Sequence, residues 1–75
     1  MAGTDDLADR LAALADEIGD LAYGTLQDAS SALGRGEEAD PELIAQERRL
    51  TRARRAVEKA VQVLRGASAD DARDD

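Results

Sequence analysis

The amino-acid sequence predicts an all-α fold: an antiparallel, coiled-coil-like hairpin of two helices that is expected to dimerise into a four-helix bundle. Three observations support this prediction. The 75-residue chain contains one tyrosine and no other aromatic residue, so its apolar side chains are almost entirely Leu, Ile, Val and Ala. These residues recur at helical spacing in two long segments. A short segment containing two glycines separates the two.

The first helix is expected over residues 4–33, after a disordered segment at residues 1–3. Thr4 is a good N-cap residue, and Asp5 places negative charge on the first turn, where the helix dipole favours it. Gly34 follows the last periodic position, and glycine is the usual residue just past a helix end. A single long helix is therefore predicted for the first half of the chain.

The second helix is expected over residues 41–65. Asp40 is a favourable N-cap, and Pro41 suits the first helical position because its missing N–H would be unpaired there in any case. Gly66 marks the end of the helix. The loop at residues 34–40 is short, so the two helices are expected to run antiparallel as a hairpin.

Composition excludes several classes of function. The chain has no cysteine and no histidine, which removes disulfides, thiolate metal sites and the commonest general base. We therefore expect no catalytic residue, metal, cofactor or small-molecule substrate. No run approaches the length of about 20 apolar residues that spans a bilayer, and no secretion signal is visible, so a cytoplasmic protein without membrane contact is expected. Residues 67–75 are polar and acidic and are expected to be a disordered tail.

The second helix carries a heptad of apolar residues. Its main row recurs every seven residues: Leu43, Leu50, Val57 and Leu64. A second row lies three positions after the first three members: Gln46, Ala53 and Ala60. Val61 widens this stripe. The pattern is that of a coiled coil, and the apolar stripe is expected to face the first helix.

The first helix has a broader apolar arc. One series follows a 4-3-4-3 spacing: Leu7, Leu11, Leu14, Ile18 and Leu21. A continued heptad would need Thr25 and Asp28, so the series is expected to slide to Ala22, Leu26, Ala29 and Leu33, as in an eleven-residue repeat. A stripe of small residues runs beside it: Ala8, Ala12, Ala15 and Gly19. Small residues let a neighbouring helix approach closely.

This arc is too broad for one partner helix, which favours a homodimer. One edge would pack against the second helix of the same chain, and the other against a second molecule. The residues expected in the core or the dimer interface are Leu7, Leu11, Leu14, Ile18, Leu21, Leu26, Leu33, Leu43, Leu50, Val57, Val61 and Leu64.

Positive charge is concentrated on the second helix, although the whole chain has a formal net charge of −7. At about 100° per residue, four cations fall in one row opposite Leu50. They are Arg48, Arg52, Arg55 and Lys59, and we call them the basic row. Arg54 and Arg65 lie at the edge of the apolar stripe instead, where they can reach acidic residues of the first helix.

Three interpretations of the basic row compete. It is a solvated face, a docking surface for an acidic protein or the acidic back of a second subunit, or a nucleic-acid contact. The net charge, the acidic first helix and the absence of an aromatic residue on the second helix argue against nucleic acid, which remains the alternative. Tyr23 is a weaker candidate for a partner contact. We therefore expect a non-catalytic interaction or regulatory protein.

Overall fold

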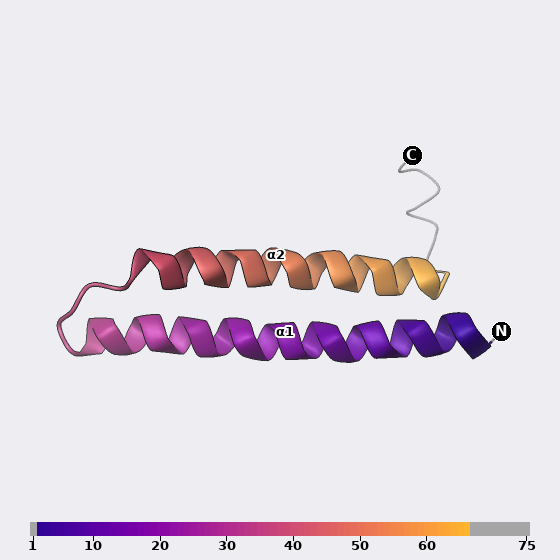
Figure 1. The fold of residues 1–75 in the computed structure, drawn as a ribbon, viewed down its shortest axis with the longest axis horizontal. Helices are drawn as coiled ribbons and strands as arrows, with labels where there is room; N and C mark the ends of the chain where they lie inside the picture. Colours follow the sequence, from indigo (N-terminus) through magenta and orange to yellow (C-terminus); the bar gives the residue numbers. More distant parts are fainter. Residues whose placement is uncertain (1, 67–75) are drawn as a thin grey trace.

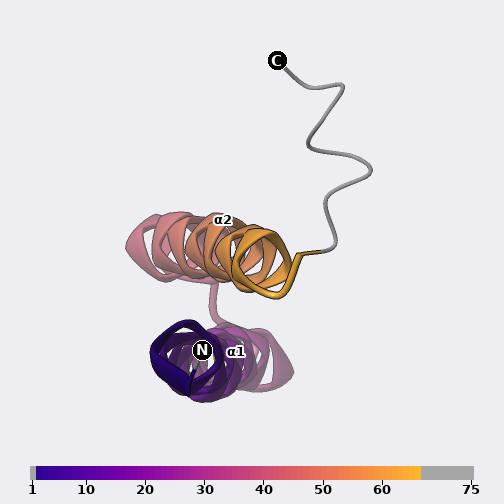
Figure 2. The ribbon, with the colours of Figure 1, turned by 90° about the vertical axis from the view of Figure 1, so that its right-hand side faces the viewer.

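The computed structural model describes residues 2–66, and this part of the chain contains two helices and no strand. Helix α1 spans Ala2–Gly34 and helix α2 spans Pro41–Leu64. They lie side by side and antiparallel, joined by a short loop (Figure 1). The view along the helices in Figure 2 shows two stacked rods, so each helix has one helical neighbour. The hairpin predicted from the sequence is confirmed; the predicted tail, residues 67–75, lies outside the described residues.

Helix α1 begins earlier than expected. Its backbone is helical from Ala2, so Thr4 lies inside the helix and is not its N-cap, and residues 2 and 3 are helical where disorder was expected. Alanine is the best helix former, and Gly3 takes a helical conformation without positive φ. Asp5 still lies in the first turn, where its charge interacts favourably with the positive end of the helix dipole.

The C-terminus of α1 is closed by a Schellman motif. The N–H of Glu37 donates to the carbonyl of Ala32 at 2.8 Å, and the N–H of Gly36 donates to the carbonyl of Leu33 at 3.0 Å. Gly36 has a φ of 80°, the left-handed conformation that this motif requires. Gly34 is the last helical residue and has no positive φ. The helix therefore extends one residue past the expected end, and Gly36 stops it.

The boundaries of α2 follow the predicted chemistry closely. The side chain of Asp40 accepts a hydrogen bond from the backbone N–H of Glu42 at 2.9 Å, and Pro41 is the first helical residue. Arg65 is the C-cap, so the last helical residue is Leu64 rather than residue 65. Gly66 follows with a φ of 83°.

The contact between the helices is built from small residues on α1. Ala8, Ala15 and Ala29 are buried, and Ala22, at the same heptad spacing, is half-buried. Ala8 has an exposed fraction of 0%. No large side chain of the described residues is fully buried. The predicted close approach along the small-residue stripe is thus confirmed at Ala8 and Ala15, and it leaves this hairpin with a very thin core.

A second row on α1 completes the contact and corrects the predicted drift. The half-buried residues Leu11 and Ile18 continue in register to Thr25, which is buried. Thr25 escapes the cost of burying a hydroxyl because its Oγ1 donates to the carbonyl of Leu21 at 2.9 Å. The heptad therefore continues where an eleven-residue slide was expected. Of the residues to which the series was expected to move, Ala29 is buried and Ala22 half-buried, because both belong to the alanine row, whereas Leu26 and Leu33 are exposed.

On α2 the stripe that faces α1 also differs from the predicted one. The main heptad row is half-buried as expected, and so is Ala60 of the predicted second row, but Gln46 and Ala53 are exposed. The second row on the contact side lies four positions after the first, and its member Val61 is the buried residue of α2. An alternation of three and four residues between inward positions explains this, because it places Val57 and Val61 on the inner face and turns Ala53 outward.

The expected core or interface residues thus divide into two groups. Half-buried or buried in the hairpin are Leu11, Ile18, Leu43, Leu50, Val57, Val61 and Leu64. Exposed in the single chain are Leu7, Leu14, Leu21, Leu26 and Leu33. Leucine is the more hydrophobic residue, but the close helix contact selects alanine on α1. The exposed leucines do not belong to the core of the hairpin.

Candidate interaction surfaces

Two contacts between the helices identify one long side of the hairpin. Arg65 of α2 donates to Asp9 Oδ1 of α1 at 2.8 Å. Further along, Gly19 of α1 lies under the guanidinium of Arg54, and a Cβ added at this glycine would meet Arg54 Nη1 at 3.3 Å. Both contacts lie on the same side of the buried alanine row, because Asp9 follows Ala8 by about 100°. We call this side the ionic side.

The opposite side of the hairpin carries an apolar face. Each leucine that directly precedes a member of the alanine row lies about 100° the other way, away from Asp9. The same side of α2 carries the residue just before Arg54 and the residue just before Val61. It also carries the residue two positions after Arg54 and the residue two positions after Val61. The members are Leu7, Leu14, Leu21, Ala53, Ala56, Ala60 and Val63, which we call the apolar face. All are exposed except Ala60, which is half-buried.

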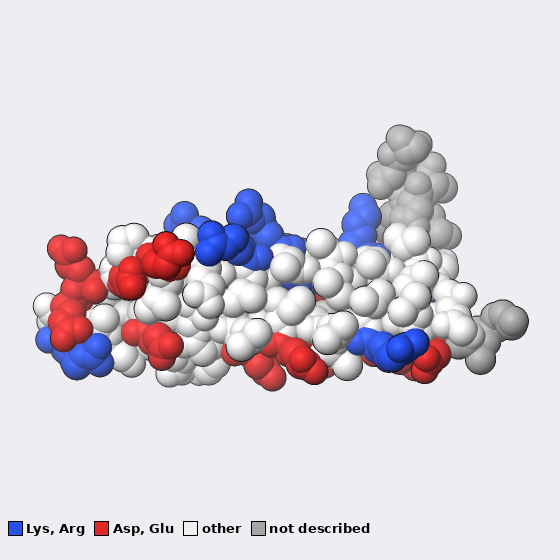
Figure 3. Space-filling view, in the orientation of Figure 1, with Lys and Arg blue, Asp and Glu red and all other residues white. Residues whose placement is uncertain are grey.

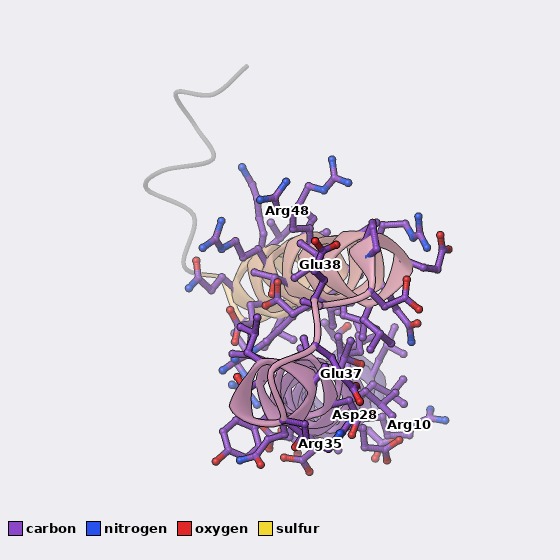
Figure 4. All side chains as sticks on the ribbon, turned by 90° about the vertical axis from the view of Figure 1, so that its left-hand side faces the viewer. Arg10, Asp28, Arg35, Glu37, Glu38 and Arg48 are labelled. Carbon is purple, nitrogen blue, oxygen red and sulfur yellow. The ribbon has the colours of Figure 1, made fainter. Side chains whose placement is uncertain are left out.

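The apolar face occupies the open half of the hairpin, away from the loop. Figure 3 shows uncharged surface that extends over both helices there, between acidic groups along α1 and basic groups along α2. Figure 4 labels Arg10 and Asp28 on this same side of α1. Asp28 takes the next place in the series of Leu7, Leu14 and Leu21, so the apolar face ends toward the loop. The sequence pattern alone does not single out Ala56 and Val63, because their position on this face depends on which stripe of α2 contacts α1.

The basic row lies on the outer surface of α2, as predicted. Arg48, Arg52, Arg55 and Lys59 are all exposed. Figure 4 shows Arg48 pointing away from α1. The first three of these residues border one shallow hollow of about 460 Å³, together with Glu47 and Thr51. The structure therefore brings these arginines together on a surface that α1 does not cover.

Ion pairing separates the three arginines of the basic row from the other arginines of the hairpin. Arg10 pairs with Asp6, Arg35 with Glu37, Arg49 with Glu42, Arg54 with Glu58 and Arg65 with Asp9. Within residues 3–66, Arg48, Arg52 and Arg55 make no ion pair. Glu47, which borders the same hollow, instead accepts a hydrogen bond from Thr51 Oγ1 at 2.9 Å. Positive charge that is not neutralised by an ion pair among these residues is therefore concentrated at Arg48, Arg52 and Arg55.

The two arginines expected to reach across to α1 behave differently. Arg65 does so, through its contact with Asp9. Arg54 pairs with Glu58 of its own helix at 3.0 Å, and its guanidinium covers Gly19. Residues four apart are neighbours on a helix surface, so Glu58 lies close to Arg54 on α2, which explains the local pair.

Tyr23 is exposed on α1 and is not part of the basic row. Its hydroxyl accepts a hydrogen bond from Gln27 Nε2 at 2.7 Å, within the same helix. The sequence placed it on the acidic back of the helix as a weaker contact candidate. Its exposed ring is available to a partner, but the described contacts do not join it to the arginines of α2.

Neither a metal-binding cluster nor a membrane-spanning helix is found among the described residues. Among residues 3–66, no group of acidic side chains is arranged to hold a metal ion. Neither α1 nor α2 is long and apolar enough to cross a membrane. The features that stand out are the two surfaces, one apolar and one basic. No protein-family model, curated protein or solved structure matches this chain.

Proposed function

We propose that this protein is a non-catalytic interaction module that self-associates and uses the basic row to bind an acidic segment of another protein. The observation that carries the proposal is the contrast among the arginines. Arg48, Arg52 and Arg55 are exposed side by side without an ion pair among the described residues, whereas the other arginines of the hairpin are paired.

The geometry suits carboxylates. Arginine presents a planar fork of N–H donors that matches a carboxylate in a bidentate arrangement. Arg48, Arg52 and Arg55 are spaced by three and four residues, so their guanidinium groups form a short row along one side of α2. An acidic peptide lying along the helix would meet several of them in succession, and the hollow between them would admit its side chains.

An acidic protein segment suits the row better than nucleic acid does. Helix α1 carries Asp and Glu along its length, and the whole chain has a net charge of −7, which repels a long polyanion. The basic row also has no aromatic neighbour on α2 on which a base could stack. A short acidic peptide can contact the row without lying against α1.

Self-association is supported by the thin core. The buried side chains of the hairpin are alanines, Thr25 and Val61, and no large side chain is fully buried. Chains of this size rarely bury enough apolar surface to be stable alone. The exposed leucines on α1 would supply the missing burial in a homodimeric four-helix bundle.

The docking proposal is tested with two triple variants that lose the same charge. One changes Arg48, Arg52 and Arg55 to Gln; the control changes the paired Arg35, Arg49 and Arg65 to Gln. Binding of a fluorescent oligoglutamate peptide, an RNA hairpin and a DNA duplex is measured by anisotropy at about 50 and 200 mM salt. Circular dichroism checks that both variants remain helical.

We expect the oligoglutamate peptide to bind the native chain and the control and to lose at least about tenfold in affinity for the first variant. Equal loss in both variants would mean that net charge alone attracts the peptide, and the docking proposal would fail. Tighter binding of the RNA or DNA than of the peptide would favour the nucleic-acid alternative instead.

A further inference from the structure

We infer that two copies of this chain pair through the apolar face in an antiparallel arrangement, with Leu14 of both copies at the two-fold axis. This inference rests on the self-association proposed above and specifies its interface. Leu7 of one copy would pack against Leu21 of the other, and the loops would lie at opposite ends of the dimer.

The spacing of the leucines on the apolar face supports a two-fold axis at Leu14. Leu7 and Leu21 lie seven residues on either side of Leu14. The contacts of Asp9 with Arg65 and of Gly19 with Arg54 set the alignment of the helices, and they place Leu14 level with Ala60. A two-fold axis through this level superimposes the apolar face on itself, which a symmetric interface requires.

The alanines of α2 complete the same interface. Ala53 and Ala60 stand beside the leucine row, with Ala56 and Val63 at the outer edge. Rotation about the axis brings Val63 of one copy toward Ala56 of the other. Small residues on α2 allow the second hairpin to approach closely, so the leucines of both copies can meet in the centre.

Charges at the edge of the face are complementary in this arrangement. Arg10 lies four residues before Leu14 and Glu17 lies three residues after it, on the same side of α1. Antiparallel pairing about Leu14 therefore sets Arg10 of each copy beside Glu17 of the other, twice in the dimer. Within one chain Arg10 pairs with Asp6 at 3.2 Å. Both side chains are mostly exposed, so breaking this ion pair to form the one with Glu17 costs little free energy.

The other symmetric arrangement, with both loops at the same end, is less favourable. It would overlap the whole length of the hairpins and bring Asp28 into the interface, since this residue continues the leucine row. Burying the Asp28 carboxylate in this interface would remove it from water, and the free-energy cost of that burial opposes dimerisation. The antiparallel arrangement about Leu14 leaves the loop half of each hairpin, with Asp28, outside the contact.

The basic row remains open in this dimer. Arg48 and Arg55 lie on the outer surface of α2, on the flank next to the ionic side and away from the apolar face. The dimer would therefore present two basic rows on its outer surfaces. An acidic partner with two binding segments would gain avidity from them if its linker spans the distance between the rows.

Cysteine cross-linking tests the arrangement, because the native chain contains no cysteine. The single variants are Leu14→Cys and, as a matched control on the ionic side, Leu26→Cys; both leucines have an exposed fraction of 48%. A disulfide forms readily only when the two Cα atoms come within about 7 Å. Sedimentation equilibrium measures dimerisation of each reduced variant, and circular dichroism verifies its helicity.

We expect rapid cross-linking of Leu14→Cys under mild oxidation and little of Leu26→Cys. Mixed Leu7→Cys and Leu21→Cys chains should form the heterodisulfide in preference to either homodisulfide. A dimer that cross-links through Leu26→Cys, or through Leu7→Cys with itself, overturns the arrangement and leaves self-association standing. A native chain that stays monomeric and helical overturns both the arrangement and self-association, without bearing on the basic row.

A charge-swap series gives an independent check. Arg10→Glu alone or Glu17→Arg alone would place like charges across the interface, and each should weaken the dimer by about two- to tenfold. The double variant should restore native affinity, because opposite charges again face each other. Failure of the double variant to recover would contradict the pairing of Arg10 with Glu17.

Discussion

Arg65 donates a hydrogen bond to Asp9 at 2.8 Å and thereby connects the end of α2 to the beginning of α1. This contact determines which side of the buried alanine row is ionic and which is apolar. The contact shows how the two helices are aligned but adds little to the free energy of unfolding, because the Asp9 side chain is 72% exposed and the Arg65 side chain 49% exposed. Exposed ion pairs of this kind contribute little to stability.

A double-mutant cycle with Asp9→Asn and Arg65→Gln should therefore give a coupling energy below about 1 kcal/mol. Urea denaturation at one fixed protein concentration measures it, since dimerisation would make stability depend on concentration. The coupling should fall further when salt is raised. A coupling of several kcal/mol would indicate that the pair is shielded from water, in disagreement with the exposure seen here.

Replacing Ala15 by Leu should destabilise the hairpin by about 1–3 kcal/mol. Ala15 is 3% exposed in the contact with α2, so a larger side chain would push the helices apart. The matched control is Ala13→Leu, because Ala13 is exposed on the same helix and should change stability by no more than about 0.5 kcal/mol. Equal stability of the two variants in urea denaturation would rule out the close contact along the alanine row.

Helix boundaries were the part of the fold that local chemistry could predict. Asp40 and Pro41 start α2 because a capping carboxylate and a fixed φ act within one turn, whatever the rest of the chain does. Gly66 ends it by its left-handed conformation. The start of α1 was predicted less well, since Thr4 is capable of capping a helix but nothing forces the helix to begin there.

The choice of the contact stripe depended on packing that the sequence does not encode locally. Hydrophobicity favours the leucine series, yet the alanine row on α1 faces α2 because it permits a shorter distance between the helices. Thr25 is a poor core residue by its hydroxyl alone, but the helix supplies the carbonyl of Leu21 as an acceptor for that hydroxyl. The outward position of the basic row was predicted correctly, because its angular position depends on α2 alone.

Glycines inside α1 offer a direct test of packing against helix propensity. Nothing lies within 4 Å of a Cβ added at Gly24, so Gly24→Ala should stabilise the protein by about 1 kcal/mol. At Gly19 the added Cβ would meet the Arg54 guanidinium at 3.3 Å, and this flexible group must move while it holds Glu58. Gly19→Ala should therefore raise the melting temperature less than Gly24→Ala does. The reverse order in thermal unfolding would show that Arg54 does not rest on Gly19.

The end of α1 should respond oppositely to the same substitution at two nearby glycines. Gly34 is helical with open space around it, so Gly34→Ala removes unfolded-state freedom and should stabilise by about 0.4–1 kcal/mol. Gly36 also has open space, but its φ of 80° is the left-handed conformation, in which a Cβ costs about 1–2 kcal/mol. Gly36→Ala should therefore destabilise the hairpin, as measured by thermal unfolding at one concentration. Because the surroundings of the two glycines are equally open, opposite signs would isolate backbone conformation as the cause, and equal signs would mean that α1 does not end in the Schellman motif described here.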